Sequence, residues 1–132
     1  MEKKIPVQYS HPYPTDMDLS KYDVRFWVEG DCLDSPDSPI RLKDGQRLKV
    51  HELERDDGVY HIYRHIEEMR GKVCTIMFVE NGKRYCLVKE VVGLVEITGS
   101  LIMTFYNPKK TNISLKIDSI ERVYIVDGVI DQ

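Results

Sequence analysis

A cysteine stands directly after a Gly-Asp pair that ends an apolar, strand-like run. The run is Val24–Val28, and the pair is Gly30-Asp31. Because such a pair ends a strand sharply, Cys32 is expected at the start of a loop, where a nucleophile can be presented. Lys89 lies far downstream in a second apolar run. A lysine buried in a strand tends to lose its proton, so Cys32 and Lys89 together would supply a nucleophile and a general base.

The strand that holds Lys89 is predicted to belong to a hairpin. Asn81-Gly82, the strongest two-residue hairpin signal, separates strand-like segments at 73–79 and 83–91. Counting away from this turn places Cys74 opposite Lys89, and directly opposed residues share one face of a sheet. We therefore expect Lys89 to lie on an apolar face and to be at least partly buried. The apolar residues expected on that face are Ile76, Phe78, Tyr85 and Leu87.

The other segments predict a mainly β fold with one amphipathic helix. Apolar residues recur every three to four positions over about 59–70, which is typical of a helix, and Gly71 follows as a C-cap. The many short strand-like runs are typical of a curled, mostly antiparallel sheet. Further strands are expected at 24–28, 46–50, 94–98, 101–106, 113–117 and 120–126.

Two segments lack the patterns of regular structure. Residues 1–22 hold three of the six prolines and no helical periodicity, so we expect an extended N-terminal arm there. Residues 31–45 contain several Asp and Pro residues and are expected to form a long loop. The remainder, residues 23–132, is expected to be a single domain, because a chain of 132 residues is long enough for one core.

The composition of the chain argues against several classes of function. Nineteen Lys and Arg against 22 Asp and Glu give a net charge of −3, which argues against a nucleic-acid-binding surface. No apolar run approaches the roughly 20 residues that span a membrane, and the N-terminus has no apolar signal core, so we expect a cytoplasmic protein. The three cysteines lack Cys-x-x-Cys spacing, which indicates free thiols. We expect neither a metal nor a cofactor.

Five short motifs follow one another along the chain. They are Val28–Leu33, Leu42–Val50, Leu87–Val91, Tyr106-Asn107-Pro108 and Ile125–Ile130. Over roughly residues 22–130, their order resembles the LexA-like peptidase domain of SOS repressors, phage repressors and related mutagenesis proteins. The resemblance implies a LexA-like fold of curled antiparallel sheets, here with one inserted helix. It also implies a homodimer that works in the cytoplasm, in a bacterial or phage regulatory system.

The resemblance assigns roles to two residues. Cys32 falls on the position of the family's nucleophilic serine, and Lys89 falls on its general-base lysine. Leu33 stands where methionine is usual, and Gln46 replaces the second aspartate of an Asp-Gly-Asp segment. The resemblance therefore implies a variant Ser/Lys dyad with cysteine as the nucleophile.

The chain also departs from the family's usual organisation. The loop from Cys32 to Asp44 is longer than usual, and the helix at 59–70 looks like an insertion. No helix-turn-helix precedes the domain, and residues 1–29 hold no Ala-Gly or Cys-Gly bond for self-cleavage. We therefore expect neither direct DNA binding nor self-cleavage.

Three functions remain open at this point. The preferred interpretation is a stand-alone LexA-like module that binds or regulates a protein partner, with a degraded Cys32/Lys89 dyad. The alternative is an active Cys/Lys peptidase that cleaves a protein partner in trans, since a thiolate is a better nucleophile than a hydroxyl. A third is a purely structural homodimer. In the degraded case, the Lys89 stem packs while its ammonium group reaches water.

For each of the other reactive side chains, a structural role has to be weighed against a catalytic or metal-binding role. Cys74 is either a second nucleophile or, as we prefer, a residue that fills the core. His61 and His65 are one helical turn apart, so they form either a metal-binding pair or, as we prefer, an exposed pair. Ser35 and Ser38 lie in the long loop, and neither follows the Gly-Asp turn as a nucleophile would.

Overall fold

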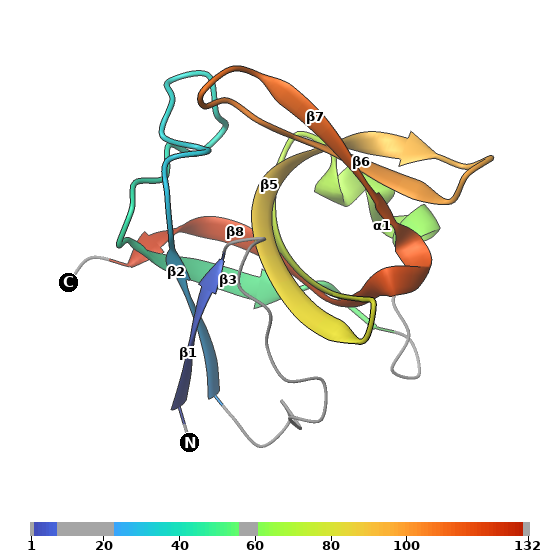
Figure 1. The fold of residues 1–132 in the computed structure, drawn as a ribbon, viewed down its shortest axis with the longest axis horizontal. Coiled ribbons are helices and arrows are strands. Elements are labelled where there is room, and N and C mark those ends of the chain that lie inside the picture. Colours follow the sequence, from blue (N-terminus) through green and yellow to red (C-terminus); the bar gives the residue numbers. More distant parts are fainter. Residues whose placement is uncertain (1, 8–22, 56–60, 131–132) are drawn as a thin grey trace.

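The structure, a computed structural model, describes residues 2–7, 23–55 and 61–130. These residues form eight strands, one α-helix and a short 3-10 helix at Ile117–Ser119 (Figure 1). The α-helix is α1 (Ile62–Met69). The strands are β1 (Glu2–Val7), β2 (Asp23–Val28), β3 (Arg47–Glu52), β4 (Val73–Glu80), β5 (Lys83–Val95), β6 (Ser100–Phe105), β7 (Thr111–Lys116) and β8 (Ile120–Ile130).

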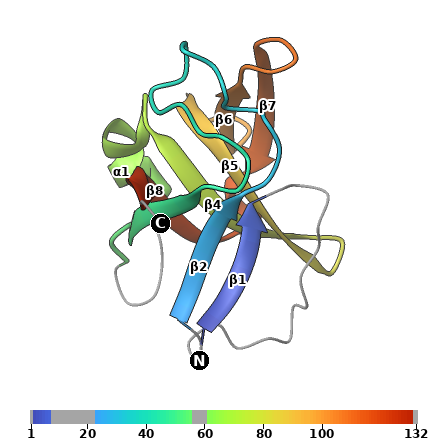
Figure 2. The same cartoon turned by 90° about the vertical axis from the view of Figure 1, so that its left-hand side faces the viewer.

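The eight strands form one sheet in the order β1-β2-β3-β8-β4-β5-β6-β7. All neighbouring strands are antiparallel except β1 and β2, which pair in parallel. Figure 1 shows the sheet curled, with β5 bent into an arc, and Figure 2 shows β1 and β2 side by side. The expected mainly β fold with one helix is therefore confirmed, although the strands form a single sheet.

The predicted hairpin is confirmed in its turn and in its register. Asn81 and Gly82 have φ angles of 53° and 74°, the left-handed values that a tight two-residue hairpin turn requires. Cys74 pairs with Lys89, and Ile76 pairs with Leu87. The structure thus places Lys89 on the strand face that the sequence predicted.

The strand expected at 94–98 is not a separate element. Residues 94 and 95 continue β5, and residues 96–99 form the turn to β6. The register of β5 against β6 shifts between Val91 and Gly93, so a β-bulge at this glycine bends the strand without ending it. β8 continues in the same way past Asp127-Gly128, where its register against β3 shifts.

The helix α1 is shorter than the predicted span of 59–70, of which residues 59 and 60 lie outside the described residues. Ile62 and Met69 are buried, as the apolar spacing predicted, whereas Tyr63 is exposed. Gly71 has a φ of 77°, the left-handed conformation of a residue that ends a helix. No helix in the described part of the chain is long and apolar enough to cross a membrane.

The core consists of two clusters that meet at β4. Val73 and Met77 pack in the first cluster, with residues of β2, the 29–46 loop and β8. Cys74, Ile76 and Phe78 point to the other face and pack in the second cluster, with residues of α1 and β6. The first cluster therefore anchors the loop that carries Cys32, and the second supports the strand face of Lys89.

A buried ion pair crosses β4. Arg84 of β5 is buried, and its Nε lies 2.9 Å from Oε1 of Glu121 on β8. Its Nη2 donates to Oε2 of the same carboxylate at 3.0 Å. Since β4 lies between β5 and β8 in the sheet, the pair ties three neighbouring strands together.

The expected N-terminal arm, residues 1–22, is described only in part. Its residues 2–7 form β1 along β2, and residues 8–22 lie outside the described residues.

Candidate functional site

Cys32 lies in the loop that leaves β2, and a turn at Gly30 sets its position. Gly30 has a φ of 89°, which favours glycine, and its N–H donates to Oδ1 of Asp44 at 2.8 Å. The N–H of Asp34 donates to the carbonyl of Asp31 at 3.0 Å and closes a tight turn around Cys32. Cys32 is partly exposed, as expected for a residue presented at the start of a loop.

The loop between β6 and β7 holds this turn from another side. The backbone N–H groups of Tyr106 and Asn107 both donate to the Cys32 carbonyl, at 2.8 and 3.2 Å. The side-chain amide of Asn107 donates to the carbonyls of Asp31, at 2.7 Å, and Asp34, at 2.8 Å. We call these four hydrogen bonds the Asn107 clip. Because β6 ends just before Tyr106, the clip ties the backbone of Cys32 to the sheet.

Lys89 enters the site from β5. Its side chain is partly buried, as the sequence predicted from the apolar face. Its Nζ lies 5.0 Å from the centroid of the Phe105 ring at the end of β6. An aromatic face attracts an ammonium group at this distance, so the Phe105 ring is a favourable neighbour for the end of the Lys89 side chain.

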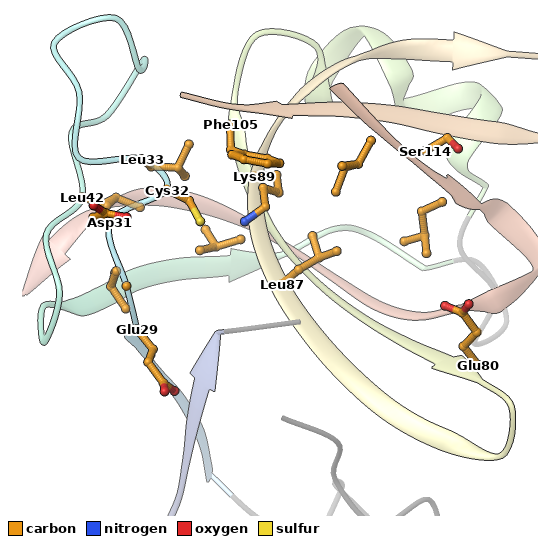
Figure 3. Close-up of a pocket in the computed structure, with 15 residues that line it drawn as sticks. Glu29, Asp31, Cys32, Leu33, Leu42, Glu80, Leu87, Lys89, Phe105 and Ser114 are labelled. Atoms are coloured by element: carbon orange, nitrogen blue, oxygen red, sulfur yellow. The ribbon is translucent and has the colours of Figure 1, made fainter. Parts of the chain in front are cut away.

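Cys32 and Lys89 line the same cavity, which has a volume of about 660 Å³ (Figure 3). In Figure 3 the Cys32 sulfur and the Lys89 nitrogen point toward one another. Within the described part of the chain, no hydrogen bond joins these two groups. The apolar residues that line the cavity are Val28, Leu33, Leu42, Leu87, Val88, Phe105, Ile113 and Leu115.

Nucleophilic catalysis by Cys32 would require that Lys89 lies near the thiol and that it can reach the thiol proton. A thiol and an amine line one cavity, so both groups face the same space. A general base must also reach the proton that it removes, within hydrogen-bond distance or through one water. The Lys89 amine instead lies against Phe105. The structure thus brings the two predicted residues together without a direct bond between them.

The remaining cysteines are poor nucleophiles. Cys74 is fully buried, and this burial raises the pKa of its thiol to about 12, with Lys72 opposing the rise and Glu68 adding to it. Burial also raises the pKa of the Cys86 thiol far above its ordinary value. Both thiols therefore stay protonated near neutral pH, and Cys74 fills the core as we preferred from the sequence.

Ser35 and Ser38 shape the long loop. The Ser35 hydroxyl accepts a hydrogen bond from the N–H of Asp37 at 3.2 Å. The Ser38 hydroxyl donates to the carbonyl of Ile40 at 2.7 Å. Both serines are buried, and neither lines the cavity that holds Lys89.

The histidine pair, His61 and His65, lies near the start of α1 and within it. Nδ1 of His65 lies 3.4 Å from the carboxylate of Glu68 on the same helix. Among the described residues, no group of three or more His, Cys, Asp or Glu side chains is placed to hold a metal ion.

Tyr106 links the β6–β7 loop to β5. Its hydroxyl donates a hydrogen bond to the Glu90 carboxylate. Burial, this hydrogen bond and the negative charges of Glu90 and Asp37 raise the pKa of Tyr106 to about 12. The phenol therefore stays protonated near neutral pH and remains a donor to Glu90.

Sequence reasoning missed the roles of two residues of this loop. Tyr106-Asn107-Pro108 is one of the five motifs that carry the resemblance, but the sequence does not predict the clip that Asn107 forms. Phe105 was assigned only to a strand, although its ring is the neighbour of the Lys89 amine. The Asn-Pro pair, a common turn signal, is the one feature of the sequence that pointed to this loop.

Comparisons with known proteins found no relative of this chain. It matches no family model, and neither the curated proteins nor the solved structures include a significant match.

Proposed function

We propose that this chain is a LexA-like peptidase-fold protein whose cavity binds an extended segment of a protein partner, within a bacterial or phage regulatory system. The observation that carries the proposal is the cavity of about 660 Å³, which is lined mainly by apolar side chains and has one wall formed by β7. A cavity of this size and lining suits side chains of a bound segment.

β7 is an edge strand of the described sheet, and a segment that binds beside an edge strand is expected to be extended. β7 lies at the end of the described sheet, beyond β6, and Ile113, Ser114 and Leu115 of this strand line the cavity. A strand at the edge of a sheet presents backbone N–H and C=O groups that can pair with an added strand. Peptides often bind in this way, with backbone hydrogen bonds giving affinity and side-chain pockets giving specificity.

The contacts of Lys89 favour a binding module over an enzyme. Its ammonium lies against the Phe105 ring, and no hydrogen bond connects it to Cys32 in the described part of the chain. We therefore infer that Cys32 and Lys89 form a degraded dyad that is retained within a binding cavity.

The second candidate is an active Cys/Lys peptidase that acts on a partner in trans. The orientation in Figure 3, with the thiol and the amine facing one another, favours it. In this case neutral Lys89 takes the thiol proton, and the Cys32 sulfur attacks a peptide carbonyl. Lys89 then returns the proton to the leaving amine. A water molecule hydrolyses the resulting thioester, which frees the thiol and the carboxylic acid.

Three further properties belong to the same proposal. The protein works in the cytoplasm, forms a homodimer, as the resemblance implies, and does not bind DNA directly. Its net charge of −3 supports the last point, because phosphate contacts by Lys and Arg supply most non-specific affinity for DNA.

The binding proposal is tested with a peptide array of varied sequence, probed with the wild-type protein and with Ile113→Arg and Ser114→Arg. Both positions line the cavity, and Ser114 is exposed, so its substitution leaves the core intact. We expect both variants to lose roughly tenfold or more in affinity, since an arginine occupies space that the segment needs.

Ile97→Arg is the matched control, because Ile97 is 98% exposed and lies outside the cavity. We expect this variant to bind as the wild type does. If no peptide binds, or if the three variants bind alike, the cavity is not the binding site and the proposal is wrong.

A further inference from the structure

Lys89 is the one basic residue among the described residues that line the cavity. Its side chain is partly buried, and within the described part of the chain it forms neither a hydrogen bond nor an ion pair. The contact that the structure shows for its amine is with the Phe105 ring, whose centroid lies 5.0 Å from Nζ. The amine therefore has an aromatic neighbour but no hydrogen-bond acceptor.

The side chains around this amine do not compensate its charge. Most of the lining is apolar, and buried residues such as Leu33 and Leu87 offer no side-chain acceptor. Acidic residues also line the cavity, but none of them forms an ion pair with Lys89 in the part of the chain that the structure describes. Glu29 and Glu80 have other partners within the protein, and Asp31 is exposed to solvent.

A segment that fills the cavity would remove water from the Lys89 amine. A charged group that loses its water without gaining an opposite charge or a hydrogen bond is strongly unfavourable. An apolar side chain placed over Lys89 would leave the amine in this state, and a Lys or Arg there would add repulsion. An Asp or Glu would instead give the amine a charge-assisted hydrogen bond in place of its water.

We propose that the segment bound in the cavity places an Asp or Glu side chain on the Lys89 amine, between apolar residues that contact the rest of the lining. This inference rests on the proposed function, since it names the chemistry of the segment that the cavity binds. Charge complementarity carries it, because complementary charges across an interface fix which partner binds and in which register. Lys89 then selects the segment and does not activate Cys32.

The experiment compares three sets of synthetic peptides that share the same varied apolar flanks. The central residue is Glu in the first set, Gln in the second and Lys in the third. Both ends of each peptide are blocked and the attached dye is neutral, so the central side chain supplies the only carboxylate. Fluorescence anisotropy measures the affinity of each set. We expect the wild-type protein to bind the Glu set roughly tenfold more tightly than the Gln set, as is typical of a hydrogen bond between charged groups.

The net charge of the protein works against this expected result. At −3, the protein as a whole attracts basic peptides and repels acidic ones. A general electrostatic effect would therefore rank the Lys set first and the Glu set last. A preference for Glu has to come from a positive group at the binding site.

Two variants locate the preference at Lys89. Lys89→Met keeps a long unbranched side chain but removes the charge, so the tenfold advantage of the Glu set should disappear. The Gln set should bind this variant at least as tightly as it binds the wild type, because no charge is then dehydrated. Lys83→Met is the matched control, since Lys83 lies on the same strand, is exposed and does not line the cavity. It changes the net charge by the same amount and should leave the preference for Glu unchanged.

The outcomes separate this inference from the proposed function. Equal affinity of the wild type for the Glu and Gln sets overturns the pairing with Lys89 and leaves peptide binding intact. A preference for Glu that survives Lys89→Met, or that is lost equally in Lys83→Met, does the same. The comparison on the wild type alone can overturn the inference, so the test holds even if Lys89→Met does not fold. Failure of all three sets to bind overturns the proposed function itself.

Discussion

Cys32 and Lys89 are held in different ways. The backbone of Cys32 is fixed by hydrogen bonds to its carbonyl, and the residue is partly exposed. The end of Lys89 lies against the Phe105 ring. We therefore expect Cys32 to react with a reagent in solution, and no hydrogen bond from the Lys89 amine reaches its thiol in the described part of the chain.

At the scale of single residues, the first prediction concerns the rate at which iodoacetamide alkylates Cys32 between pH 6 and 9. We expect Lys89→Ala to change this rate by no more than about twofold, because the amine makes no hydrogen bond to the thiol. Mass spectrometry of the three cysteines gives each rate separately. Cys74, whose pKa is raised to about 12, should react far more slowly than Cys32 throughout this range.

Lys83→Ala provides the control for that measurement. Lys83 lies on the same strand and strand face as Lys89, is exposed, and does not line the cavity. A loss of about tenfold in the Cys32 rate in Lys89→Ala, with Lys83→Ala unaffected, would identify Lys89 as the base and favour the peptidase.

At the scale of elements, the turns were easier to predict than the ends of strands. The β4–β5 register followed from Asn81-Gly82, since a two-residue turn fixes which residues face one another. The ends of β5 and β8 did not follow from the sequence. Gly93 and Gly128 resemble strand breakers, but each lies at a register shift within a continuing strand. Whether a glycine ends or bends a strand depends on the neighbouring strand, which a local pattern does not include.

Of the candidate site, only the two reactive residues were predicted from the sequence. Cys32 and Lys89 stand out by their type and context. The Asn107 clip connects residues 76 and 73 positions apart, so no local pattern reveals it. The cavity likewise depends on how the sheet curls, which brings β7 beside the Cys32 loop.

The second prediction concerns this clip. Asn107→Ala removes two side-chain hydrogen bonds to the carbonyls of Asp31 and Asp34. We expect the free energy of unfolding to fall by about 1–2 kcal/mol, as is typical for the loss of two partly exposed hydrogen bonds. Urea denaturation followed by circular dichroism measures this change.

Asn112→Ala is the companion variant, since Asn112 is an exposed asparagine on the adjoining strand β7. Its free energy of unfolding should stay within about 0.5 kcal/mol of the wild type. Equal stability of the two variants would show that the two side-chain hydrogen bonds of the clip contribute nothing to the stability of the fold.

At the scale of the whole molecule, the net charge does not favour the binding of nucleic acids. The net charge is −3, and the one α-helix in the described residues exposes acidic as well as basic side chains. Glu67 and Arg70 of this region form an ion pair with each other. A helix that enters a DNA groove usually belongs to a surface with an excess of Lys and Arg.

The third prediction is therefore that the protein does not bind duplex DNA at physiological salt. A labelled duplex titrated with the protein should show no change in fluorescence anisotropy up to micromolar concentrations, because too few cations are available to replace condensed counterions. Micromolar binding that weakens steeply with added salt would contradict this expectation.

The ion pair between Arg84 and Glu121 has a consequence for how this protein can vary during evolution. Loss of either partner leaves the other charge buried or partly buried without its counterpart, which typically destabilises a protein by several kcal/mol. Replacement of both by apolar residues of similar volume is often tolerated. The two positions, 37 residues apart in the chain, are therefore expected to change together among descendants of this sequence. Lineages that keep one should keep the other, and intermediates with a single substitution should be rare.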